Sequence, residues 1–177
     1  MTQASEHMAP HHEQGAQPGP DLAIRPEHPD SAVARALVDA VQQEYRHRYG
    51  GPDETPVDLA SFEPPSGIFA VGWVHGRPVA SGALRRQDDH TAEIKRMYVA
   101  ADARRRGVGA AMLRWLEDAA ERAGYRRLVL ETGDKQPEAL AMYRSAGYEA
   151  IEPYGYYRCH PDAYALGRTL GGGPSSG

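Results

Sequence analysis

Apolar residues recur along the first half of the chain at two spacings, which predict a helix followed by strands. From Asp30 to Gly50 they return every three or four residues, the period of an amphipathic helix that Asp30 or Ser31 can cap. Three short apolar runs follow, separated by the turn sequences HGR and DDH, and such runs are typical of an antiparallel meander. The predicted strands are residues 67–74, 78–87 and 91–99, preceded by a short strand at 21–26 and a loop at 51–66.

The second half of the chain alternates between strand and helical patterns. One apolar stripe begins at Val108 and predicts a helix that ends at Gly124, and a further helix is predicted to begin at Pro137 and stop at Gly147. We expect a buried strand before that helix and late strands after it, at residues 126–132, 148–154 and 163–170. Elements in this order predict a three-layer α/β or α+β fold, in which helices cover the faces of a mixed sheet.

Length and composition narrow the class of protein. The 177 residues suit one domain, placed at residues 21–170, with a disordered leader (1–20) and a disordered tail (171–177). A net charge of −4 gives no reason to expect nucleic acid as a partner, and no apolar run approaches the roughly 18 residues of a membrane span. Because Cys159 is the single cysteine, no internal disulfide can form, which fits a reducing, cytoplasmic location. No histidine spacing suggests a metal site.

The stretch RRRGVGA, residues 104–110, lies between a predicted strand and a predicted helix start. Its two glycines allow the backbone to come close to a ligand, free amides at a helix start bind anions, and arginine side chains match phosphate oxygens. Neither the G-x-x-x-x-G-K-[ST] loop nor the G-x-G-x-x-G pattern of nucleotide sites is present. The stretch therefore predicts a different kind of phosphate site, and the alternative is a solvated basic helix start.

Residues 91–150 resemble the GNAT superfamily of acyl-CoA-dependent N-acetyltransferases. Arg104, Gly107 and Gly109 match its [Gln/Arg]-x-x-Gly-x-[Gly/Ala] signature, and ALAMYRSAGY matches the family's A-x-x-x-Tyr-x-x-x-Gly-Tyr run. The resemblance implies a mixed, mostly antiparallel sheet with one splayed strand pair and flanking helices. It also implies acetyl-CoA as the acyl donor.

The resemblance assigns most of the cofactor-binding residues. Residues 104–110 would hold the pyrophosphate, and the end of the strand at 91–99 would bind the pantetheine arm through its backbone. Family members often carry an asparagine after the next strand, and here Thr132 or Gln136 stands in that region. The predicted cofactor-binding set is Met97, Tyr98, Val99, Arg104, Arg105, Arg106, Gly107, Val108, Gly109, Ala110, Thr132, Gln136 and Tyr143.

Two residues are the candidates for acid and base. The resemblance places Tyr143 beside the coenzyme A sulfur, where a phenol can protonate a leaving thiolate, and the alternative is a tyrosine that packs on the sheet. Glu93 is the candidate base that takes the proton of the amine, and the alternative is an ordinary strand glutamate.

Further residues are candidates for contact with the acceptor. Glu44 and Glu131 are alternatives to Glu93, and Tyr154 and Tyr156 either line the acceptor side or pack in the protein. Cys159 stands beside His160, but neighbours on an extended strand point to opposite faces, which disfavours a nucleophilic pair.

The favoured function is direct acetyl transfer, within a ternary complex, to the primary amine of a small molecule. A protein lysine or N-terminal acetyltransferase is the first alternative, and a non-catalytic CoA-binding sensor is the second. We expect a monomer or a homodimer.

Overall fold

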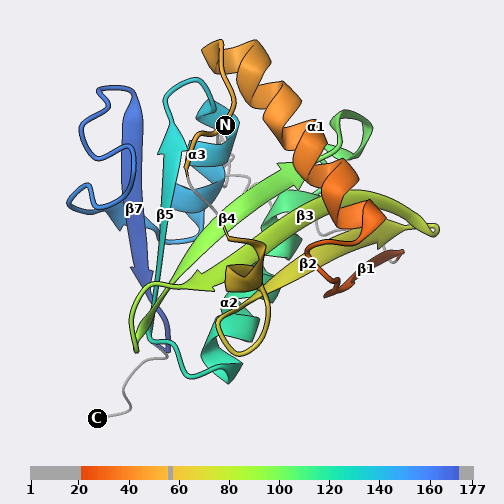
Figure 1. The fold of residues 1–177 in the computed structure, drawn as a ribbon, viewed down its shortest axis with the longest axis horizontal. Helices are drawn as coiled ribbons and strands as arrows, with labels where there is room; N and C mark the ends of the chain where they lie inside the picture. Colours follow the sequence, from red (N-terminus) through yellow and green to blue (C-terminus); the bar gives the residue numbers. More distant parts are fainter. Residues whose placement is uncertain (1–20, 56–57, 172–177) are drawn as a thin grey trace, which may run out of the picture.

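The structure, a computed structural model, describes residues 21–55 and 58–171, and within them seven strands form one sheet (Figure 1). The order across the sheet is β1-β2-β3-β4-β5-β7-β6, and every neighbouring pair is antiparallel except β4 and β5. The predicted mixed, mostly antiparallel sheet is thus confirmed. The leader 1–20 and the tail from 172 lie outside the described residues. The strands are β1 (Leu22–Pro26), β2 (Gly67–Val74), β3 (Arg77–Arg86), β4 (Thr91–Val99), β5 (Arg127–Gly133), β6 (Glu149–Ala150) and β7 (Ala163–Thr169).

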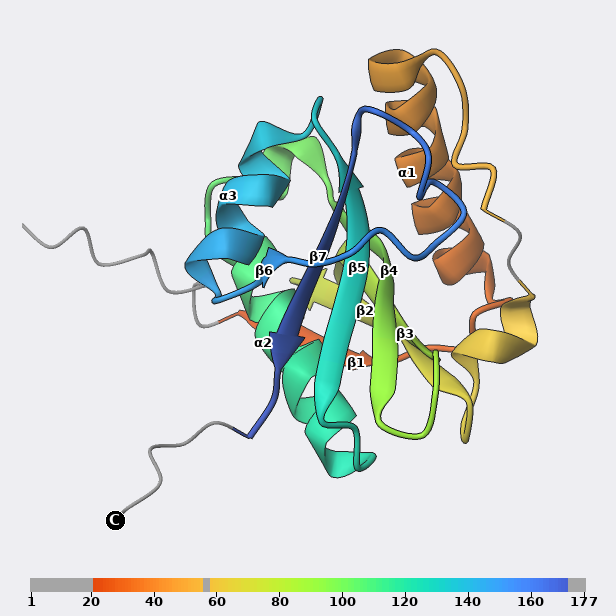
Figure 2. The same cartoon turned by 90° about the vertical axis from the view of Figure 1, so that its left-hand side faces the viewer.

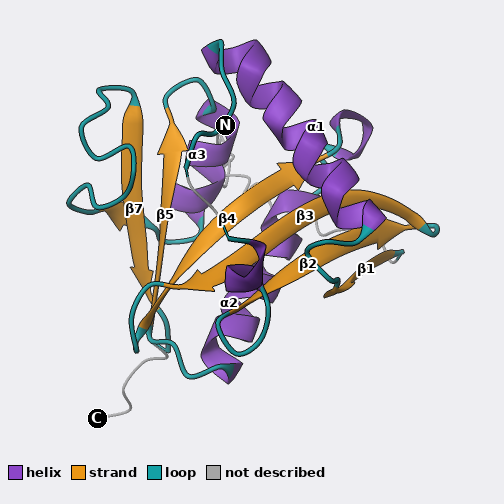
Figure 3. Cartoon of the chain, viewed as in Figure 1, coloured by secondary structure: helices purple, strands orange, loops and turns teal. Residues whose placement is uncertain are grey.

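Three α-helices in the described part of the chain complete the predicted layers. Seen from the side, α1 covers one face of the sheet, while α2 and α3 cover the other (Figure 2). Two short 3₁₀ turns, η1 (Leu59–Phe62) and η2 (Ala101–Ala103), lie in the connections, and Figure 3 shows how helices and strands alternate after β4. The helices are α1 (Ala32–Tyr49), α2 (Val108–Arg122) and α3 (Pro137–Ser145). None of the helices in the described residues is long and apolar enough to cross a membrane.

The ends of α1 follow from its sequence. The side chain of Ser31 accepts a hydrogen bond from the amide of Ala34, which satisfies one of the free donors of the first turn. The helix ends at Gly50, whose φ of 81° lies in the left-handed region that glycine adopts readily. Its buried face, centred on Leu37, packs on Phe69 of β2. On the opposite face of the sheet, α2 packs into a larger core.

The parallel pair β4 and β5 splays apart after a short contact. Residues 91–93 pair with residues 127–129, and beyond them the two strands share no pairs. The other edge of β4 stays bonded to β3 as far as Val99, and that of β5 stays bonded to β7 as far as Gly133. The predicted splayed pair is confirmed, and it leaves two facing strand edges without a strand partner.

A β-bulge lies in β4 beside the split. The register with β3 shifts between Ser81 and Ala83, so that β4 has one extra residue there, and Arg96 has a φ of 57°. The hydroxyl of Ser81 donates to the carbonyl of Arg96 at 2.8 Å, which holds the bulged residue in place. The bulge breaks the alternation of side chains along β4.

The predicted strand at 148–154 is the main difference in secondary structure. Only Glu149–Ala150 forms a strand, and the ladder ends after the amide of Ile151 bonds to the carbonyl of Ala165. Pro153 has no amide hydrogen with which to continue it. The chain then turns through residues 156–159, so Cys159 and His160 do not lie on an extended strand.

Candidate active site

A cavity of about 1230 Å³ opens where β4 and β5 separate. Its volume exceeds the roughly 300–1,000 Å³ of most small-molecule sites, so it has room for a cofactor and an acceptor together. Most of the residues predicted from the sequence line it, but Glu93, Arg106 and Tyr154 do not. The predicted residues in its wall are Glu44, Met97, Tyr98, Val99, Arg104, Arg105, Gly107, Val108, Gly109, Ala110, Glu131, Thr132, Gln136, Tyr143 and Tyr156.

The start of α2 presents unpaired amides to this cavity. Arg105 and Gly107 have φ values of 61° and 75°, which turn the backbone sharply before the helix. The first amide to bond into the helix is that of Ala111, which donates to the carbonyl of Gly107. Among the described residues, the amides of residues 105–110 have no backbone acceptor. Together with the helix dipole, they form a site suited to an anion.

The three arginines before α2 have different surroundings. Arg104 donates to the carbonyl of Val99 at 2.9 Å and to the carboxylate of Glu44 at 2.5 Å, so its guanidinium is engaged with the protein. Arg105 lines the cavity, whereas Arg106 is exposed outside it. The backbone amides and Arg105 are thus the groups of this stretch that are left to meet a phosphate.

An ion-pair chain joins α1 to both sides of the split. Glu44, bound by Arg104, also pairs with Arg48 at 2.8 Å, and Arg48 pairs with Glu138 of α3 at 2.5 Å. The amide of Gln136 donates to the hydroxyl of Tyr49 at 3.3 Å. The end of α1 therefore contacts the start of α2 and the start of α3, and the carboxylate of Glu44 is occupied by two arginines.

Tyr143 is buried on α3 and lines the cavity. Its ring packs edge-on against Tyr148, with ring centres 5.8 Å apart. Burial raises the pKa of its hydroxyl, so Tyr143 stays protonated at neutral pH. Tyr143 therefore brings a protonated phenol to the wall of the cavity.

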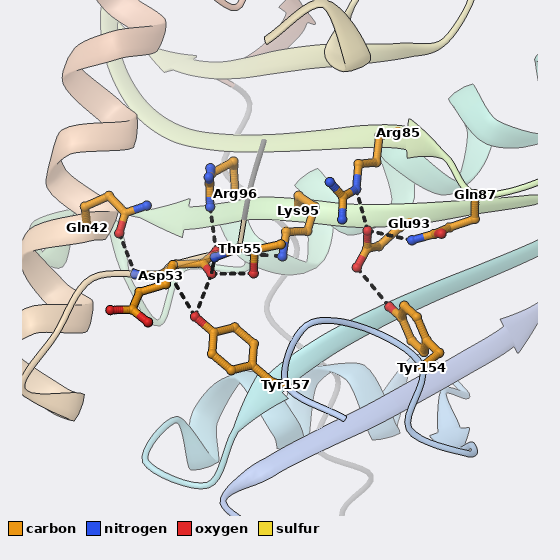
Figure 4. Close-up of polar contacts among 11 residues, drawn as sticks. Gln42, Asp53, Thr55, Arg85, Gln87, Glu93, Lys95, Arg96, Tyr154 and Tyr157 are labelled. Carbon is orange, nitrogen blue, oxygen red and sulfur yellow. Dashed lines mark hydrogen bonds and ion pairs between the residues drawn. The ribbon is translucent and has the colours of Figure 1, made fainter. Parts of the chain in front are cut away.

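Glu93 lies in the paired part of β4, before the split begins, and is 1% exposed. Its carboxylate accepts hydrogen bonds from Arg85 at 2.6 Å and from Gln87 at 2.8 Å, and the hydroxyl of Tyr154 donates to its other oxygen at 3.1 Å (Figure 4). Glu93 and Tyr154 therefore contact each other, and neither of them lines the cavity.

Glu131, near the end of β5, does reach the cavity. Its Oε2 is buried without a hydrogen-bond partner among the described residues, and its carboxylate packs against Gly155. Burial raises the pKa of this carboxyl group, Lys95 opposes the change, and the charge of Glu93 adds to it. Of the three candidate glutamates, Glu131 is the one that lines the cavity without an ion pair among the described residues.

Asp53 heads a polar cluster that the sequence did not indicate (Figure 4). One oxygen accepts from Arg96 at 2.7 Å and lies 3.7 Å from the ammonium of Lys95. The other accepts from the amide and hydroxyl of Thr55, at 3.0 and 2.6 Å, and from the hydroxyl of Tyr157 at 2.9 Å. Burial alone would raise the pKa of Asp53, but Lys95, Thr55 and Arg96 together lower it to about 2. The described residues contain no group of three or more metal-ligand side chains that could hold an ion.

The splayed strand pair and the helix that starts beside it are the features that the resemblance to the GNAT superfamily implied. Residues 49–148 match the acetyltransferase (GNAT) family, and the chain belongs to this family. It is therefore an acyltransferase enzyme, as the resemblance predicted.

Individual relatives agree with this assignment. An IAA acetyltransferase from Azospirillum brasilense is 30% identical over 148 residues, which cover 83% of this chain and 95% of that protein. The structure assigned to an acyl-CoA N-acyltransferase of Klebsiella pneumoniae superposes with a TM-score of 0.73 at 25% identity, over 84% of this chain and 97% of that one. A GNAT acetyltransferase of Elizabethkingia anophelis with acetyl-CoA bound shares the fold, with a TM-score of 0.63 at 17% identity, over 85% and 99% of the two chains.

Proposed function

We propose that the enzyme transfers the acetyl group of acetyl-CoA directly to the primary amine of a small molecule, with both substrates bound at once. One observation carries this proposal: Tyr143, with its hydroxyl, and Glu131, a carboxylate without an ion pair among the described residues, line the same cavity. An acid and a base at the same cavity suit a reaction that protonates one substrate and deprotonates the other. We also propose that the enzyme works in the reducing cytoplasm, because its single cysteine, Cys159, is free.

Acetyl-CoA suits the groups along the split. The unpaired amides of residues 105–110 match its pyrophosphate, and the free edge of β4 around Met97 and Val99 matches the amide groups of its pantetheine arm. An added Cβ at Gly109 would lie 3.1 Å from the sulfur of Met142, so the cradle leaves little space for a larger residue. Bound there, acetyl-CoA supplies an acetyl group activated as a thioester.

Glu131 has the properties of the base. An alkylammonium has a pKa of about 10.4 and must lose a proton before its nitrogen can attack a carbonyl carbon. A carboxylate whose pKa is raised by burial accepts that proton more readily than an ordinary glutamate. Glu93, the base favoured by the sequence, remains a second candidate that would have to act through a water, since its carboxylate is occupied.

Tyr143 has the properties of the acid. Its neutral hydroxyl can hydrogen-bond to the sulfur as negative charge develops there and can supply the proton that the leaving thiolate needs. In the balanced reaction the N–C bond forms and the C–S bond breaks. The ammonium nitrogen loses two protons, one proton ends on the sulfur through Tyr143, and the other leaves through Glu131.

The test is the release of free thiol from acetyl-CoA across a panel of small amines and peptides. Small amines should release CoA, and initial rates with both substrates varied should give the intersecting lines of a ternary complex. Cys159 also lines the cavity, so Cys159→Ala serves as a control and should keep full activity. Reaction with peptides alone would reject the small-molecule acceptor, parallel lines would reject direct transfer, and binding of acetyl-CoA without any release would indicate a sensor.

A further inference from the structure

Two charged side chains in the wall of the cavity have bonding capacity that the protein does not use. Lys95 is 8% exposed, and among the described residues its ammonium makes no hydrogen bond, since its ion pair with Asp53 is 3.7 Å long. Glu131 has the buried oxygen without a partner. A buried ammonium and a buried carboxylate are each costly unless they are hydrogen-bonded, which makes both sites candidates for contact with a ligand.

Both carboxylate oxygens of Asp53, the acidic group beside Lys95, already accept hydrogen bonds from other residues. Arg96 takes one oxygen of Asp53 at 2.7 Å, and Thr55 and Tyr157 take the other. Lys95 and Arg96 thus share the single charge of Asp53, Arg96 in contact and Lys95 at 3.7 Å, and the ammonium of Lys95 keeps hydrogen-bond donors for another acceptor. Figure 4 shows Lys95 at the edge of this cluster, on the strand that borders the split.

Lys95 and Glu131 lie near each other but do not form an ion pair. The positive charge of Lys95 opposes the rise in the pKa of Glu131, yet the two side chains form no salt bridge. They come from β4 and β5, the strands on opposite sides of the split, and both line the cavity. The ammonium of Lys95 and the carboxylate of Glu131, on opposite sides of the split, are complementary to a ligand that carries one negative and one positive group.

We propose that the acceptor is a small amino-acid-like zwitterion, whose amine is presented to Glu131 while its carboxylate binds the ammonium of Lys95. This inference rests on the proposed function and specifies its acceptor. The nitrogen is acetylated as described above, and the carboxylate takes no part in bond making. Lys95 acts as a specificity residue that fixes the end of the acceptor opposite the reacting amine.

The experiment compares three matched acceptors: an amino acid, its methyl ester, and the amine that lacks the carboxyl group. The wild-type enzyme should prefer the amino acid, because only that acceptor forms a charge-assisted bond to Lys95. In Lys95→Met, kcat/KM for the amino acid should fall by about 10- to 100-fold, the range for a lost charged hydrogen bond, chiefly through KM. The values for the ester and the simple amine should change little, and Lys95→Arg should retain part of the preference.

Controls separate this inference from the function on which it rests. Arg122→Met removes an exposed charge at the far end of α2 and should change none of the three acceptors. Calorimetric binding of acetyl-CoA by Lys95→Met establishes that the variant is folded. The inference is overturned if the wild type acetylates the amine or the ester as well as the amino acid, or if Lys95→Met lowers all three equally. The proposed function itself fails if no amine of any kind releases CoA.

Discussion

Replacing Asp53 with asparagine removes the negative charge that holds two buried cations beside the cavity. The side chain of Asp53 is 10% exposed and that of Arg96 is 9% exposed, so solvent screens their 2.7 Å contact only weakly. Asparagine keeps the size of the side chain and one acceptor oxygen, which isolates the effect of the charge. We expect Asp53→Asn to fold at neutral pH with a clearly lower free energy of unfolding.

The magnitude follows from the lowered pKa. A fall in the pKa of Asp53 from 3.8 to about 2, at about 1.4 kcal/mol per pH unit, corresponds to roughly 2 kcal/mol of stability at neutral pH. Because the pKa is lower in the folded state, this stabilisation is present above the unfolded value of 3.8 and is lost as the pH falls toward 2. The difference between wild type and variant should therefore shrink to about half near pH 3.

Urea unfolding of both proteins at pH 7, 4 and 3 measures this difference. Asp39→Asn, an exposed change on α1, is the matched control and should shift the unfolding midpoint very little at any pH. A difference below about 0.5 kcal/mol at pH 7, the size expected of a surface substitution, would refute the argument. So would a difference that stays constant from pH 7 to pH 3.

Three further predictions concern catalysis and cofactor binding. Tyr143→Phe should lower kcat by about 100-fold, in the range of lost general acid catalysis, with the KM for acetyl-CoA nearly unchanged, and an unchanged kcat would remove Tyr143 from the mechanism. The pH profile of kcat/KM should fall on the acid side with a midpoint above the ordinary glutamate pKa, because burial raises the pKa of Glu131. Glu131→Gln should abolish the activity that depends on this group. If the same acid-side fall persists in the variant, the titrating base is Glu93 instead. Gly109→Val should weaken acetyl-CoA binding by calorimetry at least about tenfold, because its side chain meets Met142 where the backbone must approach the cofactor, and wild-type affinity would argue against the cradle.

Hydrophobic spacing was enough to predict most elements of the fold. The strand at Thr91–Val99 and the helix start at Val108 lie where the sequence places them, since alternating and helical periods differ clearly there. The strand predicted at 148–154 was wrong over most of its length, because residues that suit a strand need a partner edge, and β7 pairs with only two of them. Strand pairing is a long-range property that a local pattern does not contain.

The site was predicted less completely, for a related reason. Glu93 and Glu131 look alike in sequence, and what separates them is the point at which β4 and β5 part, three pairs along the strand. Lys95 and Arg96 are neighbours and would point to opposite faces of a regular strand, but the bulge at Arg96 lets both approach Asp53. Asp53 itself comes from a loop, where no periodicity marks it.

Because β4 and β5 pair through only three residues each, the sheet consists of two half-sheets joined by a short contact. One half-sheet contains β1 to β4 and the other contains β5 to β7, and each keeps its own complete ladders. Across the groove, the ion-pair chain through Glu44 and Arg48 fastens the far ends of these halves. Three backbone pairs therefore hold the two half-sheets in register, and the hydrophobic core that both halves share under α2, together with the ion-pair chain across the groove, provides the remaining contact between them.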